Sequence, residues 1–322
     1  MGNQTEYSSP EVITFGESMG LFTAQDTRGL EYASTLSKSF GGAESNVAIG
    51  LARLGHRAGW FGRLGNDALG QMIYKAIRGE GVDVSRAQLS EGEATGLMIR
   101  ENVPGKSSVH YYRKFSAASQ MTPSDLDIDY ISRAKILHVT GITAAISESS
   151  RETVLEAVRI AKQAGVLVSF DPNLRLKLWT LQEARPVLLS LAQEADYFLP
   201  GLDELKMLYE EENTDKILDR LKQLDAVSIV KGGPELTYVL QRGSVEEVPF
   251  VKADQVIDTV GAGDGFGAGF LSGVLQGLNP VEAAGIGSLT GSLMVQAVGD
   301  WEALPTAAEV KAKLSNAHHI ER

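Results

Sequence analysis

Short apolar runs alternate with amphipathic segments along most of the chain. Four of these runs have the length of buried strands, at residues 12–15, 136–139, 166–170 and 227–230. Strands that alternate with helices predict an α/β fold, a doubly wound and mostly parallel sheet flanked by helices. Ligands bind beyond the carboxyl ends of the strands in such sheets. We therefore expect the polar motifs that follow the strands to converge on one face.

Two segments, residues 18–40 and 92–115, do not follow this alternation. The second contains two β-like runs with Pro104-Gly105 between them, which predicts a hairpin. We interpret both segments as a small β-sheet that covers the site as a lid. The α/β domain then comprises residues 11–17, 41–91 and 116–322. Because the open edges of such a sheet often pair with another subunit, we expect a homo-oligomer.

Composition narrows the functional classes. Of the 322 residues, 43% are hydrophobic, which is enough for a sizeable core, and none is a cysteine, which excludes a disulfide, a thiolate metal site and a cysteine nucleophile. A net charge of −11 argues against a nucleic-acid partner. Residues 1–10 do not resemble a signal peptide, and no apolar run is long enough to span a membrane. We expect a cytoplasmic enzyme with no nucleic-acid or membrane partner.

Residues 258–264, Asp-Thr-Val-Gly-Ala-Gly-Asp, form the most informative stretch. The apolar pair Val256-Ile257 predicts a strand leading into it, and apolar residues from Phe270 onward predict a helix leading out. A glycine turn at a helix N-terminus exposes backbone amides that bind anions. With the carboxylate of Asp264 beside it, this turn favours phosphoryl transfer, in which the amides hold negative charge and Asp264 accepts a proton.

A structural alternative exists for the same residues. Asp264 would then be an N-cap, and Gly265, Gly269 and Gly273 would let a neighbouring helix pack closely. Other phosphate-binding patterns are absent, because the sequence has no Walker A loop, no GxGxxG spacing and no protein-kinase catalytic loop.

The stretch 258–264 resembles the signature of the ribokinase-like (PfkB) carbohydrate kinases, Asp-Thr-x-Gly-Ala-Gly-Asp. This resemblance implies a ribokinase-like fold, with Asp264 as the catalytic base. It also implies that the amides of Gly261, Ala262 and Gly263 form an anion hole.

A second resemblance lies near the N-terminus. Residues 40–48 look like the first motif of the same family, Gly-Gly-x-x-x-Asn-x-Ala. The resemblance implies that Gly41 and Gly42 let sugar hydroxyls reach backbone amides and that Asn46 donates a hydrogen bond to the sugar. The matches extend from about residue 12 to residue 300, which is nearly the whole chain.

Two further stretches resemble the 2-keto-3-deoxygluconate kinases of this family. They are residues 111–113 with 116–119, and residues 171–175 with Leu178-Trp179. The resemblance implies that Tyr111 and Arg113 on the lid bind a sugar acid and that Arg175 meets its carboxylate. Arginine can clamp a carboxylate bidentately, which lysine does less well. The alternatives are an exposed strand arginine for Arg113 and a surface ion pair for Arg175.

The same resemblance assigns the remaining site residues. Glu17 stands where many family members begin the sugar site with aspartate, and Asp258 is a further sugar contact. The implied nucleotide contacts are Asn173, Lys231, Gly232, Gly233, Thr259, Gly261 and Gly263. Glu204 is the implied magnesium ligand, but the family's Asn-x-x-Glu motif begins here with Gly201, so the use of Mg²⁺ through this motif stays open.

Together these residues predict a kinase that uses ATP and Mg²⁺ to phosphorylate the terminal hydroxyl of a sugar acid. The expected substrate is 2-keto-3-deoxygluconate and the expected product is its 6-phosphate. A fructokinase or another neutral-sugar kinase is the alternative enzyme. A non-catalytic sugar-binding sensor is the alternative of another class, and the intact Asp264 disfavours it because a sensor needs no base.

Overall fold

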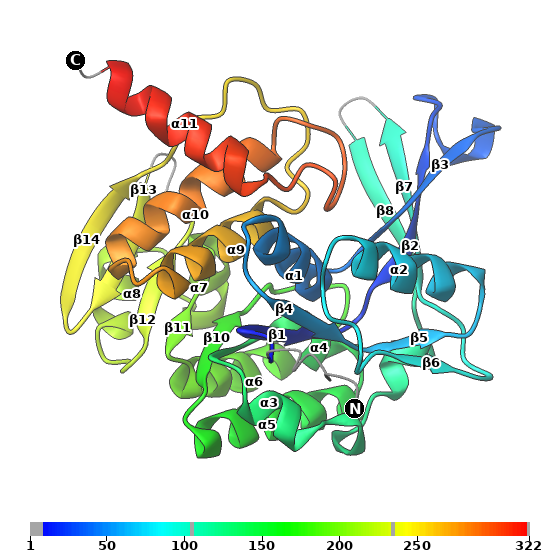
Figure 1. Ribbon diagram of the computed structural model, residues 1–322, viewed down its shortest axis with the longest axis horizontal. Helices are drawn as coiled ribbons and strands as arrows, with labels where there is room; N and C mark the ends of the chain where they lie inside the picture. Colours follow the sequence, from blue (N-terminus) through cyan, green and yellow to red (C-terminus); the bar gives the residue numbers. More distant parts are fainter. Residues whose placement is uncertain (1–8, 104–105, 233–235, 321–322) are drawn as a thin grey trace, which may run out of the picture.

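A mostly parallel sheet forms the centre of the molecule (Figure 1). The computed structural model describes residues 9–103, 106–232 and 236–320. In this part of the chain the main sheet has eight strands, in the order β14-β13-β12-β11-β10-β9-β1-β4. The parallel strands are β1 (Val12–Phe15), β4 (Ala58–Phe61), β9 (Ile136–Thr140), β10 (Leu167–Asp171), β11 (Tyr197–Phe198) and β12 (Val227–Val230). The predicted parallel sheet is confirmed.

Helices cover both faces of this sheet, because successive strand residues point to opposite faces and both sets are apolar. Ile13 and Phe15 pack in one core, whereas Val12 packs in the other. The first face is covered by α3 (Ile128–Ser132), α4 (Gly141–Ile146), α5 (Glu148–Ala164), α6 (Leu181–Glu194), α7 (Leu202–Tyr209) and α8 (Thr214–Leu221). The second is covered by α1 (Ala43–Arg53), α2 (Ala68–Gly79), α9 (Ala262–Leu275) and α10 (Pro280–Met294), and α11 (Ala307–Ile320) lies against α10 (Figure 1).

A second sheet lies beside these layers and is built from the two segments that interrupt the alternation (Figure 1). Its order is β3-β2-β7-β8, with β2 (Met19–Ala24), β3 (Leu36–Gly41), β7 (Leu97–Val103) and β8 (Lys106–Tyr112). β7 and β8 pair antiparallel, so the predicted hairpin is confirmed, and β2 joins the two segments by pairing in parallel with β7. That this sheet is a separate lid domain with the predicted boundaries stays a prediction.

Shorter elements complete the chain. The 3-10 helices are η1 (Leu30–Tyr32), η2 (Ala117–Gln120) and η3 (Pro123–Asp125). Two strand pairs were not predicted: the parallel pair β5 (Arg63–Gly65) and β6 (Gln88–Ser90), and the antiparallel pair β13 (Leu236–Gln241) and β14 (Ser244–Pro249) at one edge of the main sheet. Among the helices that the structure describes, none has the length and apolar character needed to cross a membrane.

The strand predicted at Val256-Ile257 is wrong. These side chains are 62% and 49% exposed, and the Ile257 amide donates to the carbonyl oxygen of Val295, just past the end of α10, over 2.8 Å. The position beside β12 is taken by the β13–β14 hairpin, so the segment that leads to Asp258 runs outside the sheet.

Candidate active site

A cavity of about 1330 Å³ lies between the carboxyl ends of the parallel strands and the second sheet. This volume exceeds the usual range for one small ligand, so the cavity has room for two substrates. Most of the predicted site residues line it: Glu17, Gly41, Gly42, Asn46, Tyr111, Arg113, Asn173, Arg175, Glu204, Lys231, Gly232, Thr259, Gly261, Gly263 and Asp264. Ala262 and Asp258 are not part of its wall, and Gly233 lies outside the described residues. Motifs far apart in sequence thus converge on one face.

The turn before α9 brings backbone amides to the edge of the cavity. Gly261 has a φ of 74°, and a Cβ atom there would overlap Met294 and the carbonyl oxygen of Asp300, so only glycine fits. The Ala262 amide, which was predicted to bind the anion, turns back towards Thr259 O at 3.4 Å. Within the described residues the amides of Gly261 and Gly263 have no acceptor, so they remain available to an anion.

Asp264 lies in the first turn of α9 and faces this cavity. Asn46 Nδ2 donates to Asp264 Oδ2 over 2.8 Å. Burial, and after it the charge of Asp300, raise the pKa of Asp264 to about 8. A carboxylate whose pKa is near neutral takes up a proton readily, which suits a general base. The N-cap of α9 is Gly261 and not Asp264, so the N-cap alternative is wrong.

The later glycines of α9 let a neighbouring helix pack closely, as the structural alternative predicted. A Cβ atom at Gly269 would overlap Thr290, and one at Gly273 would overlap Ala283, both on α10. The helix therefore uses its first turn for the site and its later glycines for close packing.

Asn46 links two carboxylates. One of its amide hydrogens is directed to Asp264, and the other to Asp300 Oδ1 over 2.8 Å. Both donors are thus engaged, contrary to the donation to a sugar that the resemblance implies. Its carbonyl oxygen is buried and has no hydrogen-bond partner in the described part of the chain, so it can accept from a ligand.

Asp300 was not predicted as a site residue. It lines the cavity with 8% of its surface exposed, and burial raises its pKa to about 6. It lies in the irregular loop between α10 and α11, where no turn motif or metal-ligand spacing marks it in the sequence.

Arg113 is held by a protein carboxylate. Its Nη2 lies 2.5 Å from Glu17 Oε2 in an ion pair whose side chains are 12% and 1% exposed, and Ser116 Oγ donates to Glu17 Oε1 over 2.6 Å. The guanidinium also lies 5.8 Å from the centre of the Tyr111 ring. The exposed-strand alternative for Arg113 is wrong. Since Glu17 already neutralises it, Arg113 does not need a substrate carboxylate to be buried here.

Arg175 differs from Arg113 because it is exposed and lines the cavity. It makes no ion pair with any residue that the structure describes, so the surface ion-pair alternative is wrong. Its Nη1 donates weakly to the carbonyl oxygen of Leu174, at 3.3 Å. Arg175 is therefore the arginine of the predicted pair that is available to an anionic ligand.

Asp258, predicted to contact the sugar, instead pairs with the second sheet. Arg100 of β7 reaches both of its carboxylate oxygens, at 2.5 and 2.9 Å. Burial is the largest single influence on the pKa of Asp258 and raises it. The hydrogen bonds and the charge of Arg100 oppose burial, and the pKa of Asp258 lies below its usual value. Arg100 itself lines the cavity, so a residue that the sequence did not mark ties β7 to the loop before the glycine turn.

The ends of β10 and β12 and the first turn of α7 bring a lysine and two carboxylates together. Lys231 Nζ lies 2.5 Å from Asp171 Oδ2, and Asp171 Oδ1 accepts from the amide of Asn173 over 3.0 Å. Glu204 accepts from two backbone amides, those of Leu174 (2.6 Å) and Gly201 (2.7 Å). Burial, and then the charge of Asp171, raise the pKa of Glu204.

These carboxylates fit a hydrated magnesium ion. Carboxylate oxygen is a ligand that Mg²⁺ prefers, and the ion usually keeps several waters. Every oxygen of Glu204 and Asp171 already has a protein partner, and the described residues contain no group of three or more metal-binding side chains. Glu204 and Asp171 would hold the ion mainly through water and beside an anionic ligand.

Comparison with known proteins agrees with this geometry. Residues 9–307 match the model of the pfkB family carbohydrate kinases. A 2-dehydro-3-deoxygluconokinase from Bacillus subtilis is 43% identical over 309 residues, which is 95% of either chain. The crystal structure of a PfkB protein from Polaromonas sp. JS666 has a TM-score of 0.87 and 38% identity, covering 94% of this chain and 100% of the other. That of a sugar kinase from Pyrococcus horikoshii in complex with ATP has a TM-score of 0.81 and 27% identity, covering 92% and 96%. This chain belongs to the pfkB family of carbohydrate kinases.

Proposed function

We propose that this protein transfers the γ-phosphoryl group of ATP to the terminal hydroxyl of 2-keto-3-deoxygluconate and forms the 6-phosphate. The observation that carries the proposal is the juxtaposition of Asp264, whose pKa is raised, with the available amides of Gly261 and Gly263. The name of the Bacillus subtilis relative supports the choice of substrate, and the ATP complex of the Pyrococcus horikoshii kinase supports the choice of phosphoryl donor.

In the proposed reaction the terminal hydroxyl of the sugar faces Asp264. Asp264 accepts the hydroxyl proton as the oxygen forms a bond to the γ-phosphorus and the bond between that phosphorus and the leaving oxygen of ADP breaks. The amides of Gly261 and Gly263 stabilise the negative charge that develops on the phosphoryl group. Lys231 is placed to bind a phosphate, since its Nζ lies near Gly263. A bound Mg²⁺ ion would neutralise phosphate charge.

Charge in the cavity supports an anionic sugar. The protein has a net charge of −11, yet Arg175, Lys177 and Lys114 line the cavity and form no ion pair with the described residues. Arg175 is the arginine among them, and a planar guanidinium matches the geometry of a carboxylate. A neutral-sugar kinase would not require this group.

The remaining expectations rest on this proposal. Because the reaction would consume ATP, we propose that the protein acts in the cytoplasm. The outer strands β3 and β8 of the second sheet are its edges, and edge strands often pair with another chain, so we propose a homo-oligomer. Light scattering of the purified protein tests this, and a monomeric mass would exclude it.

The proposed function is tested by a side-by-side kinase assay. We expect 2-keto-3-deoxygluconate to have a higher kcat/KM than fructose by roughly 10-fold or more, since a charge-assisted hydrogen bond contributes about 1.5–3 kcal/mol. Ribose is the third substrate. If fructose or ribose has the highest kcat/KM, the neutral-sugar alternative replaces the proposal. If none of the three stimulates ATP consumption, the sensor becomes the better interpretation.

The second sheet should also respond to substrate. We expect backbone hydrogen exchange in β7 and β8 to slow when 2-keto-3-deoxygluconate is added, because closure over the sugar would exclude water from the reaction. The buried strands β9 and β10 serve as the internal control and should not change. Identical exchange of β7 and β8 with and without the sugar would count against a lid.

A further inference from the structure

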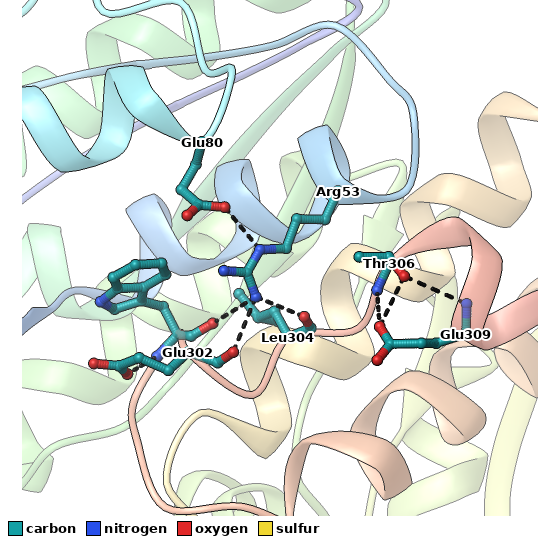
Figure 2. Close-up of polar contacts among 7 residues, drawn as sticks. Arg53, Glu80, Glu302, Leu304, Thr306 and Glu309 are labelled. Carbon is teal, nitrogen blue, oxygen red and sulfur yellow. Dashed lines mark hydrogen bonds and ion pairs between the residues drawn. The ribbon is translucent and has the colours of Figure 1, made fainter.

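The loop between α10 and α11 is fastened to α1 by one arginine (Figure 2). Nη1 of Arg53 donates to the carbonyl oxygens of Trp301, Glu302 and Leu304, at 3.4, 3.0 and 2.7 Å. Its Nε donates to Glu80 over 2.8 Å, and its guanidinium lies 5.3 Å from the centre of the Trp301 ring. Several contacts to one rigid helix therefore determine the path of this loop.

The same loop places Asp300 inside the active site. Its amide donates to Glu302 Oε2 over 2.9 Å, and its Oδ1 accepts from Asn46 over 2.8 Å. The other carboxylate oxygen lies against Gly41, where a Cβ atom would overlap it. Contacts within the protein thus position the backbone and both oxygens of Asp300.

Asn46 connects this carboxylate directly to Asp264. Its two amide hydrogens are shared between them, with both donor–acceptor distances 2.8 Å. A primary amide has a planar NH₂ group with two donors, so the position of Asp300 fixes the rotation of Asn46, and Asn46 in turn orients Asp264. Two carboxylates bridged in this way also affect each other's charge state.

We propose that Asp300 is a positioning residue for the base, which orients Asp264 through Asn46 and places a negative charge beside it. This inference rests on the proposed function, in which Asp264 is the base. Neither the signature stretch nor any other sequence motif includes Asp300.

The charged groups around the pair agree with this role. Besides burial, Asp300, Asp171 and Glu44 raise the pKa of Asp264, whereas the hydrogen bond from Asn46 lowers it. Around Asp300 itself, Glu302 and Asp258 raise the pKa, and Asn46 and Arg100 lower it. Among the neighbouring charges, that of Asp300 has the largest effect on the pKa of Asp264. Removing this charge therefore lowers the proton affinity of the base.

The test is the pH dependence of kcat/KM in Asp300→Asn. Asparagine keeps the shape and can still accept from Asn46 through its carbonyl oxygen, but it removes the charge. The acid limb of the profile reports the base of the free enzyme, and we expect it to move to lower pH by roughly one pH unit. We also expect kcat on the alkaline plateau to fall by roughly 3–10-fold, because a weaker base transfers the proton less effectively.

Glu309→Gln is the matched control. It removes one negative charge from the same part of the chain, where Glu309 accepts from the amide and the hydroxyl of Thr306 at the start of α11 (Figure 2). Its acid limb should stay at the wild-type position. An equal shift in both variants would mean a general charge effect, and an unmoved limb with a raised sugar KM in Asp300→Asn would mean that Asp300 binds the sugar. Either result overturns the inference.

Thermal unfolding provides a readout that does not depend on activity. Folding raises the pKa of Asp264 from 3.8 to about 8 and that of Asp300 from 3.8 to about 6. From about pH 4 up to each of these folded values, the carboxyl group therefore binds more protons in the folded state than in the unfolded state. Stability from these groups is full below about pH 4 and is lost as the pH rises through 6 and then 8. Asp300→Asn removes the part of this fall that belongs to Asp300 itself, and it should also flatten the part between about pH 6 and 8 that belongs to Asp264. Glu309→Gln should flatten neither part.

The two proposals can therefore fail separately. If no sugar is phosphorylated but Asp300→Asn flattens the fall in Tm between about pH 6 and 8, where Asp264 titrates, the proposed function is wrong while the linkage of Asp300 to Asp264 stands. If the sugar acid is phosphorylated but Asp300→Asn changes neither the acid limb nor the pH dependence of Tm, the inference about Asp300 is wrong.

Discussion

Replacing Asp264 with asparagine is expected to lower kcat by roughly 10²–10⁴-fold, with little change in KM for either substrate. Asparagine has the size of the aspartate and can still accept the hydrogen bond from Asn46, but it cannot take a proton from the attacking hydroxyl. The pKa of Asp264, raised to about 8, means that the wild-type group has a substantial proton affinity to lose. Steady-state kinetics with saturating ATP and varied sugar measures the effect.

Asp67→Asn is a suitable control for this variant. Asp67 is the N-cap of α2 and accepts from the Gly70 amide over 2.8 Å, so it is a second aspartate at a helix start, and it does not line the cavity. We expect its kcat to stay within about twofold of the wild type, since asparagine also caps a helix N-terminus and Asp67 lies outside the cavity. Turnover of Asp264→Asn within about threefold of wild type would rule out Asp264 as the base.

Replacing Arg175 with alanine is expected to reduce kcat/KM for 2-keto-3-deoxygluconate by roughly 10–100-fold, because a charge-assisted hydrogen bond contributes about 1.5–3 kcal/mol. Activity on fructose should be nearly unchanged, since fructose has no carboxylate. We expect this effect at Arg175 and not at Arg113, because Arg113 is already neutralised by Glu17. Comparing the two sugars in the same variant separates loss of the carboxylate contact from general damage.

Arg159→Ala controls for the loss of a positive charge from an acidic protein. Arg159 lies on the exposed surface of α5 and pairs with Glu156. Its replacement should leave the activities on both sugars unchanged. An equal loss on fructose and on the sugar acid in Arg175→Ala would show that Arg175 does not read the carboxylate. No loss on either would exclude it from the sugar site.

Local patterns in the sequence were enough to determine the architecture and the position of the site. Runs of apolar residues such as 12–15 and 136–139 are buried on both faces, and that property is visible in the residues themselves. The residues of the turn at 258–264 are contiguous, so the anion-binding glycines and the carboxylate of Asp264 could be recognised before the fold was known. The path into the turn could not be recognised, because the β13–β14 hairpin occupies the sheet position beside β12 that a strand at Val256-Ile257 would need.

Only the tertiary structure decided which charged groups meet. Asn46 and Asp300 are 254 residues apart, and Arg100 and Asp258 are 158 residues apart. No periodicity or turn rule links residues at such separations. Their pairing follows from burial, because a charged side chain out of water costs several kcal/mol unless it finds a partner. For this reason Glu17 forms an ion pair with Arg113, and Asp258 forms one with Arg100. Among the described residues, the fold gives Arg175 no carboxylate partner, and it places Asp300 beside Asp264.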